Sequence, residues 1–206
     1  AEIYGEKFMK KIILIFILLT ILNPVYGSEK DIYKKELNEK GWIYGCKPVN
    51  MSFKEPAKGG FTLAVIQGRT DIMDLEVKAG LDITKCGENL PNIATWKKQT
   101  KALDFLLKNG FNPNQIHLDH SYLTFAIYRK NPQAVKILLE NGADANLTAK
   151  GKTPLNCAIK KNQPEIVNLL LKAGAKQNKE TQKLIKKTKN DEIKKLFEKA
   201  IKKEDK

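Results

Sequence analysis

The feature that most constrains this chain is a helical-hairpin pattern in residues 151–178, GKTPLNCAIKKNQPEIVNLLLKAGAKQN. Thr153 suits the N-cap of a short helix, and Pro154 suits its first position, where the missing N–H of proline costs nothing. Pro164 ends this helix, because proline disfavours helix in the residue before it. A second helix, with apolar residues at helical spacing, then runs to Gly174, which favours a left-handed C-cap. Such a hairpin has one apolar side that it cannot bury alone.

The same pattern recurs upstream and is least distinct in the most N-terminal copy. The glycine that ends the second helix recurs as Gly142, Gly110 and Gly80, and the alanine of the first helix (Ala158) recurs as Ala126, Ala94 and Ala64. The glycines are about 30 to 32 residues apart, close to the ~33 residues of an ankyrin array. A fixed period of this length predicts a stack of hairpins, each burying its apolar side on its neighbours.

These residues resemble the ankyrin repeat family. The resemblance is carried by Thr153-Pro154-Leu155, by Ala158 and by the run Asn-Gly-Ala-Asp-Ala-Asn at residues 141–146, and it extends over residues 51–178. It implies an all-α fold, an ankyrin-type helical-hairpin solenoid of about four repeats (51–83, 84–114, 115–146 and 147–178). Residues 179–206, with apolar positions among many lysines, are expected to form a degenerate C-terminal capping repeat and a basic tail.

The chain departs from the family pattern at several turns. The histidine that follows Thr-Pro-Leu in the family is replaced by Asn156 in one copy and by Thr124 in another. Ser121-Tyr122-Leu123 stands in place of Thr-Pro-Leu, and Pro91 is displaced. Each change is expected to weaken its turn, and the second copy is expected to be irregular.

Residues 1–27 have the pattern of a secretory signal peptide. Met9 is a more natural start than Ala1, and Lys10 and Lys11 precede an apolar run at 12–22 and a small-residue exit at Gly27. An uncleaved anchor is less favoured, because a span needs about 20 apolar residues and an Asn-Pro pair interrupts this run. The sequence predicts a periplasmic or secreted bacterial protein with no membrane span after cleavage.

Residues 28–50 lie outside the repeat pattern and are expected to cap it. A charged helix is predicted near residues 31–40, and Trp42 and Tyr44 are expected to cover the apolar end of the first repeat. A role of these two aromatic residues as a ligand clamp is the less favoured alternative.

The predicted export affects the interpretation of the three cysteines, because an oxidising compartment permits disulfides. Cys46 and Cys86 either form a disulfide or remain as thiols, and the sequence leaves both open. Cys157 is expected to be a small buried apolar residue. With only His117 and His120 besides, no metal site is predicted.

No catalytic motif is present in the sequence. It contains no G-x-S-x-G, H-E-x-x-H or glycine-rich phosphate loop. The His117-Leu118-Asp119-His120 run has metal-ligating or acid–base residues, but at a loop tip such residues are usually only solvated. The sequence predicts a protein that is not an enzyme and has no cofactor.

In the ankyrin family, the turn tips and the exposed side of each short helix line a concave binding face. The resemblance implies that ten residues contact a partner: Trp96, Lys97, Leu118, His120, Tyr128, Arg129, Lys150, Lys152, Lys160 and Lys161. Stacking is not expected to need the last four. Because lysine is abundant in a chain of net charge +14, composition alone accounts for part of this patch.

The leading hypothesis is an exported monomer that binds an acidic periplasmic or secreted protein stoichiometrically, as a scaffold, a protector or an inhibitor. One alternative is a cationic binder of anionic polymers or membrane surfaces. Another is a secreted effector that acts on a host protein. Nucleic acid is not an expected partner, because the lysines do not cluster around glycine and aromatic residues.

Overall fold

The computed structural model describes residues 28–40, 42, 44–46 and 60–204. The predicted signal peptide and the first part of the first repeat lie outside these residues. Among the residues described, no helix is both long and apolar enough to cross a membrane.

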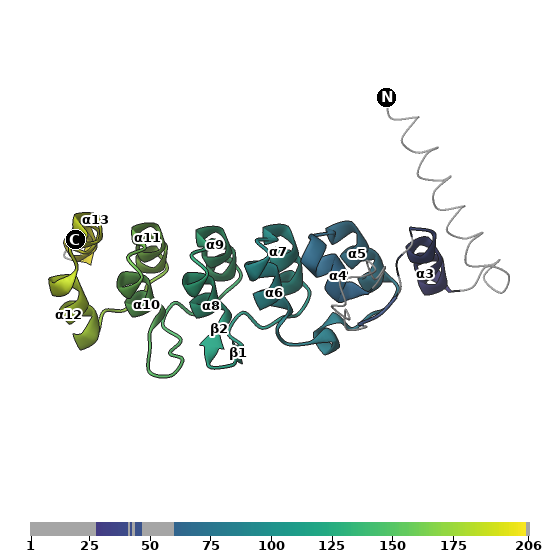
Figure 1. Ribbon diagram of the computed structural model, residues 1–206, viewed down its shortest axis with the longest axis horizontal. Helices are drawn as coiled ribbons and strands as arrows, with labels where there is room; N and C mark the ends of the chain where they lie inside the picture. The colour runs from purple at the N-terminus through teal and green to yellow at the C-terminus, as the bar shows by residue number, and fades with distance from the viewer. Residues whose placement is uncertain (1–27, 41, 43, 47–59, 205–206) are drawn as a thin grey trace, which may run out of the picture.

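The described chain is a row of helix pairs behind one N-terminal helix, α3 (Figure 1). The first helices of the pairs pack on one another in one layer, and the second helices pack in another. The helices are α3 (Glu29–Glu39), α4 (Phe61–Gln67) with α5 (Thr70–Lys78), α6 (Leu90–Trp96) with α7 (Thr100–Lys108), α8 (Tyr122–Tyr128) with α9 (Pro132–Glu140), α10 (Pro154–Lys160) with α11 (Pro164–Lys172), and α12 (Lys179–Lys187) with α13 (Asp191–Glu204). This is the expected solenoid of helical hairpins.

The recurring alanine of the first helices explains how closely these helices approach. Ala64, Ala94, Ala126 and Ala158 are all fully buried. Each lies where a first helix packs on its neighbours in the same layer, and a methyl group leaves room for the adjacent helix. Larger side chains such as Leu103 and Leu138 fill the core from the second helices.

In each of the first four helix pairs, the segment that joins the two helices contains one residue in the left-handed conformation. These residues are Gly68, Lys98, Lys130 and Asn162, with φ of 70°, 58°, 52° and 55°. A left-handed residue that is not glycine costs about 1–2 kcal/mol, so packing on both sides must offset this cost at the last three turns. The backbone conformation therefore repeats even where the residue type does not.

Side-chain amides bond each repeat to the one before it. The residue just before each of α7, α9 and α11 donates a side-chain N–H. The acceptor is a backbone carbonyl near the end of the first helix of the repeat before it. The three bonds are Gln99 to Ile66 (3.2 Å), Asn131 to Thr95 (3.2 Å) and Gln163 to Ile127 (3.0 Å). We call this set the amide ladder. It fixes the position of each hairpin against its neighbour.

A second set of bonds joins successive turns. The side chain of Asn114 donates to the Gly142 carbonyl (3.1 Å) and accepts from the Asp144 N–H (2.7 Å). Asn146 repeats both bonds one unit later, with Gly174 and Lys176. The Asn-Gly-Ala-Asp-Ala-Asn run thus fixes the positions of successive turns relative to one another, and it also ends a helix.

The replaced turn residues make other contacts. Ser121 retains the capping role, because its hydroxyl accepts from the Thr124 N–H (3.2 Å). The buried Tyr122 hydroxyl donates to the Glu88 carbonyl in the preceding unit, and burial raises the pKa of Tyr122 to about 12. Asn156 bonds forward, accepting from the Thr181 hydroxyl (2.6 Å). Tyr122 and Asn156 thus add bonds between units, whereas Ser121 keeps its bond within the turn.

The turns before α8 and α10 differ from the expected all-α structure. Before α8, β1 (Ile116–His117) and β2 (His120–Ser121) form a short antiparallel hairpin. Leu118 and Asp119 at its tip both have positive φ, which the tight two-residue turn requires. Before α10, Ala149 and Lys152 form the equivalent bridge. We call these projections the two fingers. They project below the first layer in Figure 1.

The N-terminal segment packs on the first repeat. Helix α3 packs against α5, and Trp42 is buried beside the Arg69 guanidinium, 5.8 Å from the ring centre. Tyr44 packs on the same core. Cys46 forms a disulfide with Cys86, which precedes α6, with Cα atoms 4.9 Å apart. The segment is thus tied to the first and second units.

The C-terminal pair closes the other end. Ile193 and Phe197 on α13 are buried, and α13 packs on α11. Leu184 and Ile185 on α12 are only partly buried against the core. Between residues 179 and 200, the buried apolar side chains of this pair pack on the stack, and most of its lysines are exposed to solvent.

Replacement of Asn131 by alanine tests the amide ladder. Asn131 is buried, donates to Thr95 and caps α9 by accepting from the Ala134 N–H (3.1 Å). We expect Asn131→Ala to lower the free energy of unfolding by about 2–3 kcal/mol, since it removes a cap and leaves a buried carbonyl without its donor. Urea denaturation measures this. Gln133→Ala, on the exposed side of α9, is the matched control, and an equal effect of both changes would contradict the ladder's importance.

The buried carboxyl of Glu76 predicts that stability depends on pH. Its Oε2 accepts from the Gly45 N–H (3.0 Å), and burial raises its pKa from 4.5 to about 7. The folded state therefore holds the proton more tightly, so this group lowers stability as pH rises from about 4.5 through 7. At pH 8 we expect Glu76→Gln to be more stable than wild type by about 2–3 kcal/mol, with little difference near pH 4.5.

Urea titrations at both pH values test this expectation, with the exposed Glu198→Gln as control. A Glu76→Gln gain that is the same at both pH values would show that Glu76 titrates normally.

Candidate binding surface

The ends of the first-layer helices place equivalent residues in line along the stack. Helices α6, α8 and α10 end at Trp96, Tyr128 and Lys160, and Lys97, Arg129 and Lys161 are their C-caps. A cation at a helix C-terminus is favoured by the helix dipole. Since α6 packs on α8 and α8 on α10, the three C-caps form one row across three repeats.

Cations and aromatic rings alternate along this row. Lys97 Nζ lies 4.7 Å from the centre of the Trp96 ring, and the Arg129 guanidinium lies 5.7 Å from the same ring. Lys161 Nζ lies 4.9 Å from the Tyr128 ring. Each contact contributes about 0.5–1 kcal/mol at an exposed site and restrains a long side chain. We call these five residues the cation–aromatic stripe.

The stripe exposes an unusual amount of aromatic surface. Trp96 is 49% exposed, although burial of an indole ring is strongly favourable. Tyr128 is half-buried, and the His120 ring packs edge-on against it with ring centres 5.0 Å apart. The first finger thereby reaches the stripe. Its tip residue, Leu118, is 80% exposed.

A cavity of about 310 Å³ lies between α6, the first finger and α8. Its apolar lining comes from Ile93, Trp96, Leu118 and Phe125, and its polar lining comes from Asn89, Asn92, His117 and His120. We call it the α6 cavity. The structure thus brings Trp96, Leu118 and His120 together, three of the residues predicted to bind a partner.

Sequence reasoning missed the remaining residues of this cavity. Asn92 and Ile93 precede Trp96 by four and three residues, so the three share one face of α6. Phe125 lies on α8, and only the folded first finger shows that it faces the same space. Helical spacing from Trp96 identifies the α6 residues; no sequence signal identifies Phe125.

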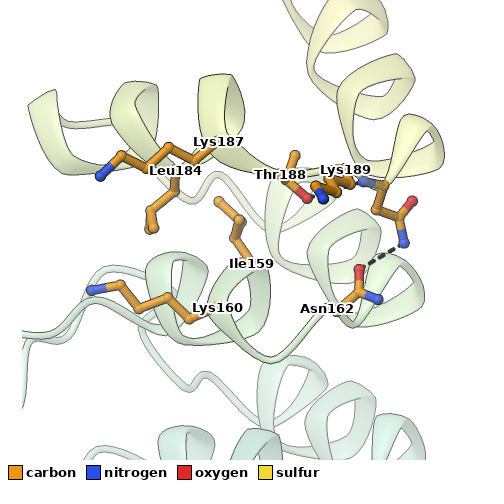
Figure 2. Close-up of a pocket in the computed structure, with 8 residues that line it drawn as sticks. Ile159, Lys160, Asn162, Leu184, Lys187, Thr188 and Lys189 are labelled. Carbon is orange, nitrogen blue, oxygen red and sulfur yellow. Dashed lines mark hydrogen bonds between the residues drawn. The ribbon is translucent and has the colours of Figure 1, made fainter.

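Two further cavities lie farther along the first layer. One, of about 320 Å³, is bordered by Tyr128, Lys152, Lys160 and Lys161. The other, of about 530 Å³, lies between α10, α12 and the start of α13 (Figure 2). Lys160 and Lys187 extend toward the same side of this cavity in Figure 2. On its opposite side, the Asn190 side chain donates a hydrogen bond to the Asn162 side chain (2.7 Å).

Two of the four predicted lysines form ion pairs within the protein. Lys150 forms an ion pair with Asp119, so it joins the tips of the two fingers. Lys160 pairs with Glu180 of the next helix pair (3.1 Å) and lowers the pKa of that carboxyl. Lys152 and Lys161 have no ion pair among the described residues. Fewer lysines are therefore available to pair with carboxylates of a partner than the sequence implies.

Two histidines and a free cysteine also lie in these repeats. His117 and His120 face each other across the first finger, but no group of three or more metal-ligating side chains occurs within the described part of the chain. Cys157 is buried, and burial raises the pKa of its thiol. A buried thiol with a raised pKa is a weak nucleophile.

The stacked hairpins, their fingers and an exposed row of equivalent positions define a helical repeat protein with a binding surface. Residues 92–181 match the family model described as ankyrin repeats (3 copies). This segment therefore consists of ankyrin repeats, and such repeats are protein–protein interaction modules that typically carry no enzymatic activity. The matched segment contains the whole stripe and both fingers. A comparison with curated proteins finds no match.

Proposed function

We propose that this protein is exported, acts as a monomer and binds one acidic partner protein stoichiometrically through the cation–aromatic stripe. The observation that carries this proposal is the stripe itself. Lys97, Arg129 and Lys161 occupy one position in three successive repeats, beside the exposed Trp96 ring and the half-buried Tyr128 ring. Capture of the partner would let the protein act as a scaffold, a protector or an inhibitor.

The charge of the stripe favours an acidic partner. Its three cations and the neighbouring Lys152 form no ion pair among the described residues, whereas Lys150 and Lys160 do. Unpaired cations in one row attract an acidic surface at long range and accelerate encounter. Trp96 and Tyr128 then provide rigid anchors of the kind that dominate interface energies.

Two features support export. Residues 1–27 have the charge and hydropathy pattern of a signal peptide. The Cys46–Cys86 disulfide suits an oxidising compartment, because thiols are kept reduced in the cytosol.

Affinity capture from a cell-envelope extract tests the binding surface. We expect the wild-type protein to retain one acidic protein at a 1:1 ratio. Arg129→Glu with Lys161→Glu should reduce recovery of that protein by tenfold or more, because two attractive contacts become repulsive. Lys101→Glu with Lys172→Glu, at exposed positions of α7 and α11 in the other layer, is the charge-matched control and should leave recovery unchanged.

Two outcomes would contradict the proposal. Equal recovery with both charge-reversed proteins would place the binding surface elsewhere. Retention of many polyanions, lost gradually as salt rises, would favour the cationic-polymer binder instead.

Cell fractionation tests export. In a bacterial host, we expect the protein in the periplasm or the medium, beginning at Ser28 by mass spectrometry, with Cys46 and Cys86 resistant to alkylation until reduced. Leu18→Arg, which interrupts the apolar run, should keep the full-length chain in the cytosol. A wild-type protein that remains cytosolic with residues 1–27 intact would overturn export and leave the binding proposal standing.

A further inference from the structure

The amide ladder does not continue into the last helix pair. In the earlier units, the residue just before each second helix donates to the last carbonyl but one of a first helix, such as Thr95 or Ile127. The equivalent acceptor for Asn190, which precedes α13, is the Ile159 carbonyl. Asn190 donates instead to the Asn162 side chain (2.7 Å). A different contact therefore joins the last pair to α10, and the cavity of about 530 Å³ lies at this joint (Figure 2). We call it the α10–α12 cavity.

This cavity is lined by cations and by no carboxylate. Its eight lining residues include Lys160, Lys187 and Lys189 and no aspartate or glutamate. Lys160 pairs with Glu180, but Lys187 and Lys189 form no ion pair among the described residues. Like charges that face one space repel one another, and an anion placed between them removes this repulsion and adds attraction. The charge of the cavity therefore points to an anionic occupant.

The apolar part of the lining restricts the occupant further. In Figure 2, the Leu184 side chain extends from α12 and the Ile159 side chain from α10, toward one another. Leu184 is only partly buried. An inorganic anion would leave this apolar surface in contact with water, whereas an aliphatic group beside an anion would cover it. The cavity therefore suits an aliphatic group with carboxylates next to it.

The α10–α12 cavity lies in line with the cation–aromatic stripe. Helices α6, α8 and α10 end at Trp96, Tyr128 and Lys160, and α12, which packs on α10, ends at Lys187. Lys160 lines the cavity and is followed by Lys161, the last cation of the stripe. A partner segment that follows the stripe beyond Lys161 therefore reaches this cavity.

Building on the binding function proposed above, we propose that the α10–α12 cavity is a second anchor point for the acidic partner. It takes a leucine or isoleucine side chain of the partner, which packs on Ile159 and Leu184. The acidic residues on either side of that side chain pair with Lys187 and Lys189. The cavity thereby extends the interface by one repeat beyond the stripe.

An NMR titration of the purified, isotopically labelled protein tests this proposal with short peptides. The probe is acetyl-Glu-Leu-Glu-amide, whose blocked ends carry no charge. In the second peptide glutamine replaces both glutamates, and in the third serine replaces leucine. We expect the probe to shift the methyl signals of Ile159 and Leu184. It should bind at least tenfold more tightly than the glutamine peptide and at least threefold more tightly than the serine peptide.

Variants of the protein identify the cations. Lys187→Glu with Lys189→Glu should weaken binding of the probe tenfold or more, because two attractive contacts become repulsive. Lys195→Glu with Lys199→Glu, at exposed positions of α13 that do not line the cavity, is the charge-matched control and should leave the affinity unchanged. The signals of the buried Ile193 report whether the last pair stays folded. If they change, Lys187→Gln with Lys189→Gln takes the place of the charge reversal and should weaken the probe threefold or more.

Specific results overturn the proposal. Equal binding of the glutamate and glutamine peptides would remove the role of the cations, and equal binding of the leucine and serine peptides would remove the aliphatic side chain. Equal weakening by the two charge-reversed double variants would show attraction to the net charge and not to this cavity. Binding of inorganic phosphate there as tightly as the probe would assign the cavity to a small anion.

Affinity capture from the cell envelope separates this proposal from the proposed function. Lys187→Glu with Lys189→Glu should reduce recovery of the captured acidic protein threefold or more. If recovery is undiminished while Arg129→Glu with Lys161→Glu still abolishes it, the second anchor point is wrong and the proposed function stands. If neither double variant reduces recovery, both proposals are wrong.

Discussion

The amide ladder is the interaction on which the rest of this structure depends. Helices of seven to nine residues are not stable alone, so each hairpin needs its neighbours. Apolar packing supplies most of the stabilisation but tolerates small shifts of one hairpin along another. A bond from Asn131 or Gln163 to one particular carbonyl does not tolerate such shifts, because a shifted unit would leave buried polar groups unpaired.

The binding surface follows from this fixed register. Lys97, Arg129 and Lys161 form a row only because their helices are held at equivalent positions. The same stacking removes Lys150 and Lys160 from the free charge, since each meets a carboxylate of an adjacent unit. The proposed binding face therefore has fewer cations available to a partner than a net charge of +14 suggests. Unpaired cations stand beside aromatic rings in the middle repeats.

Much of the fold could be predicted from the sequence. The repeat length, the glycine after each second helix and the alanine in each first helix are local signals that recur several times. The strand pairing of the first finger could not be predicted, since Leu118 is not one of the glycine, asparagine or aspartate residues favoured in such turns. The ion pairs and the walls of the cavity also depend on contacts between units. Glu180 lies in the helix pair after Lys160, and Phe125 reaches Asn92 only across a finger. Within the site, the residue types at the helix ends could be predicted; their pairing and the cavity could not.

The most direct test of this account is hydrogen–deuterium exchange on the complex with the captured partner. The stripe and the α6 cavity lie on the first layer, so protection should appear at the ends of α6, α8 and α10 and in the first finger, while α7, α9 and α11 remain unchanged. Protection confined to the second-layer helices, or to the lysines of α12 and α13, would contradict the account.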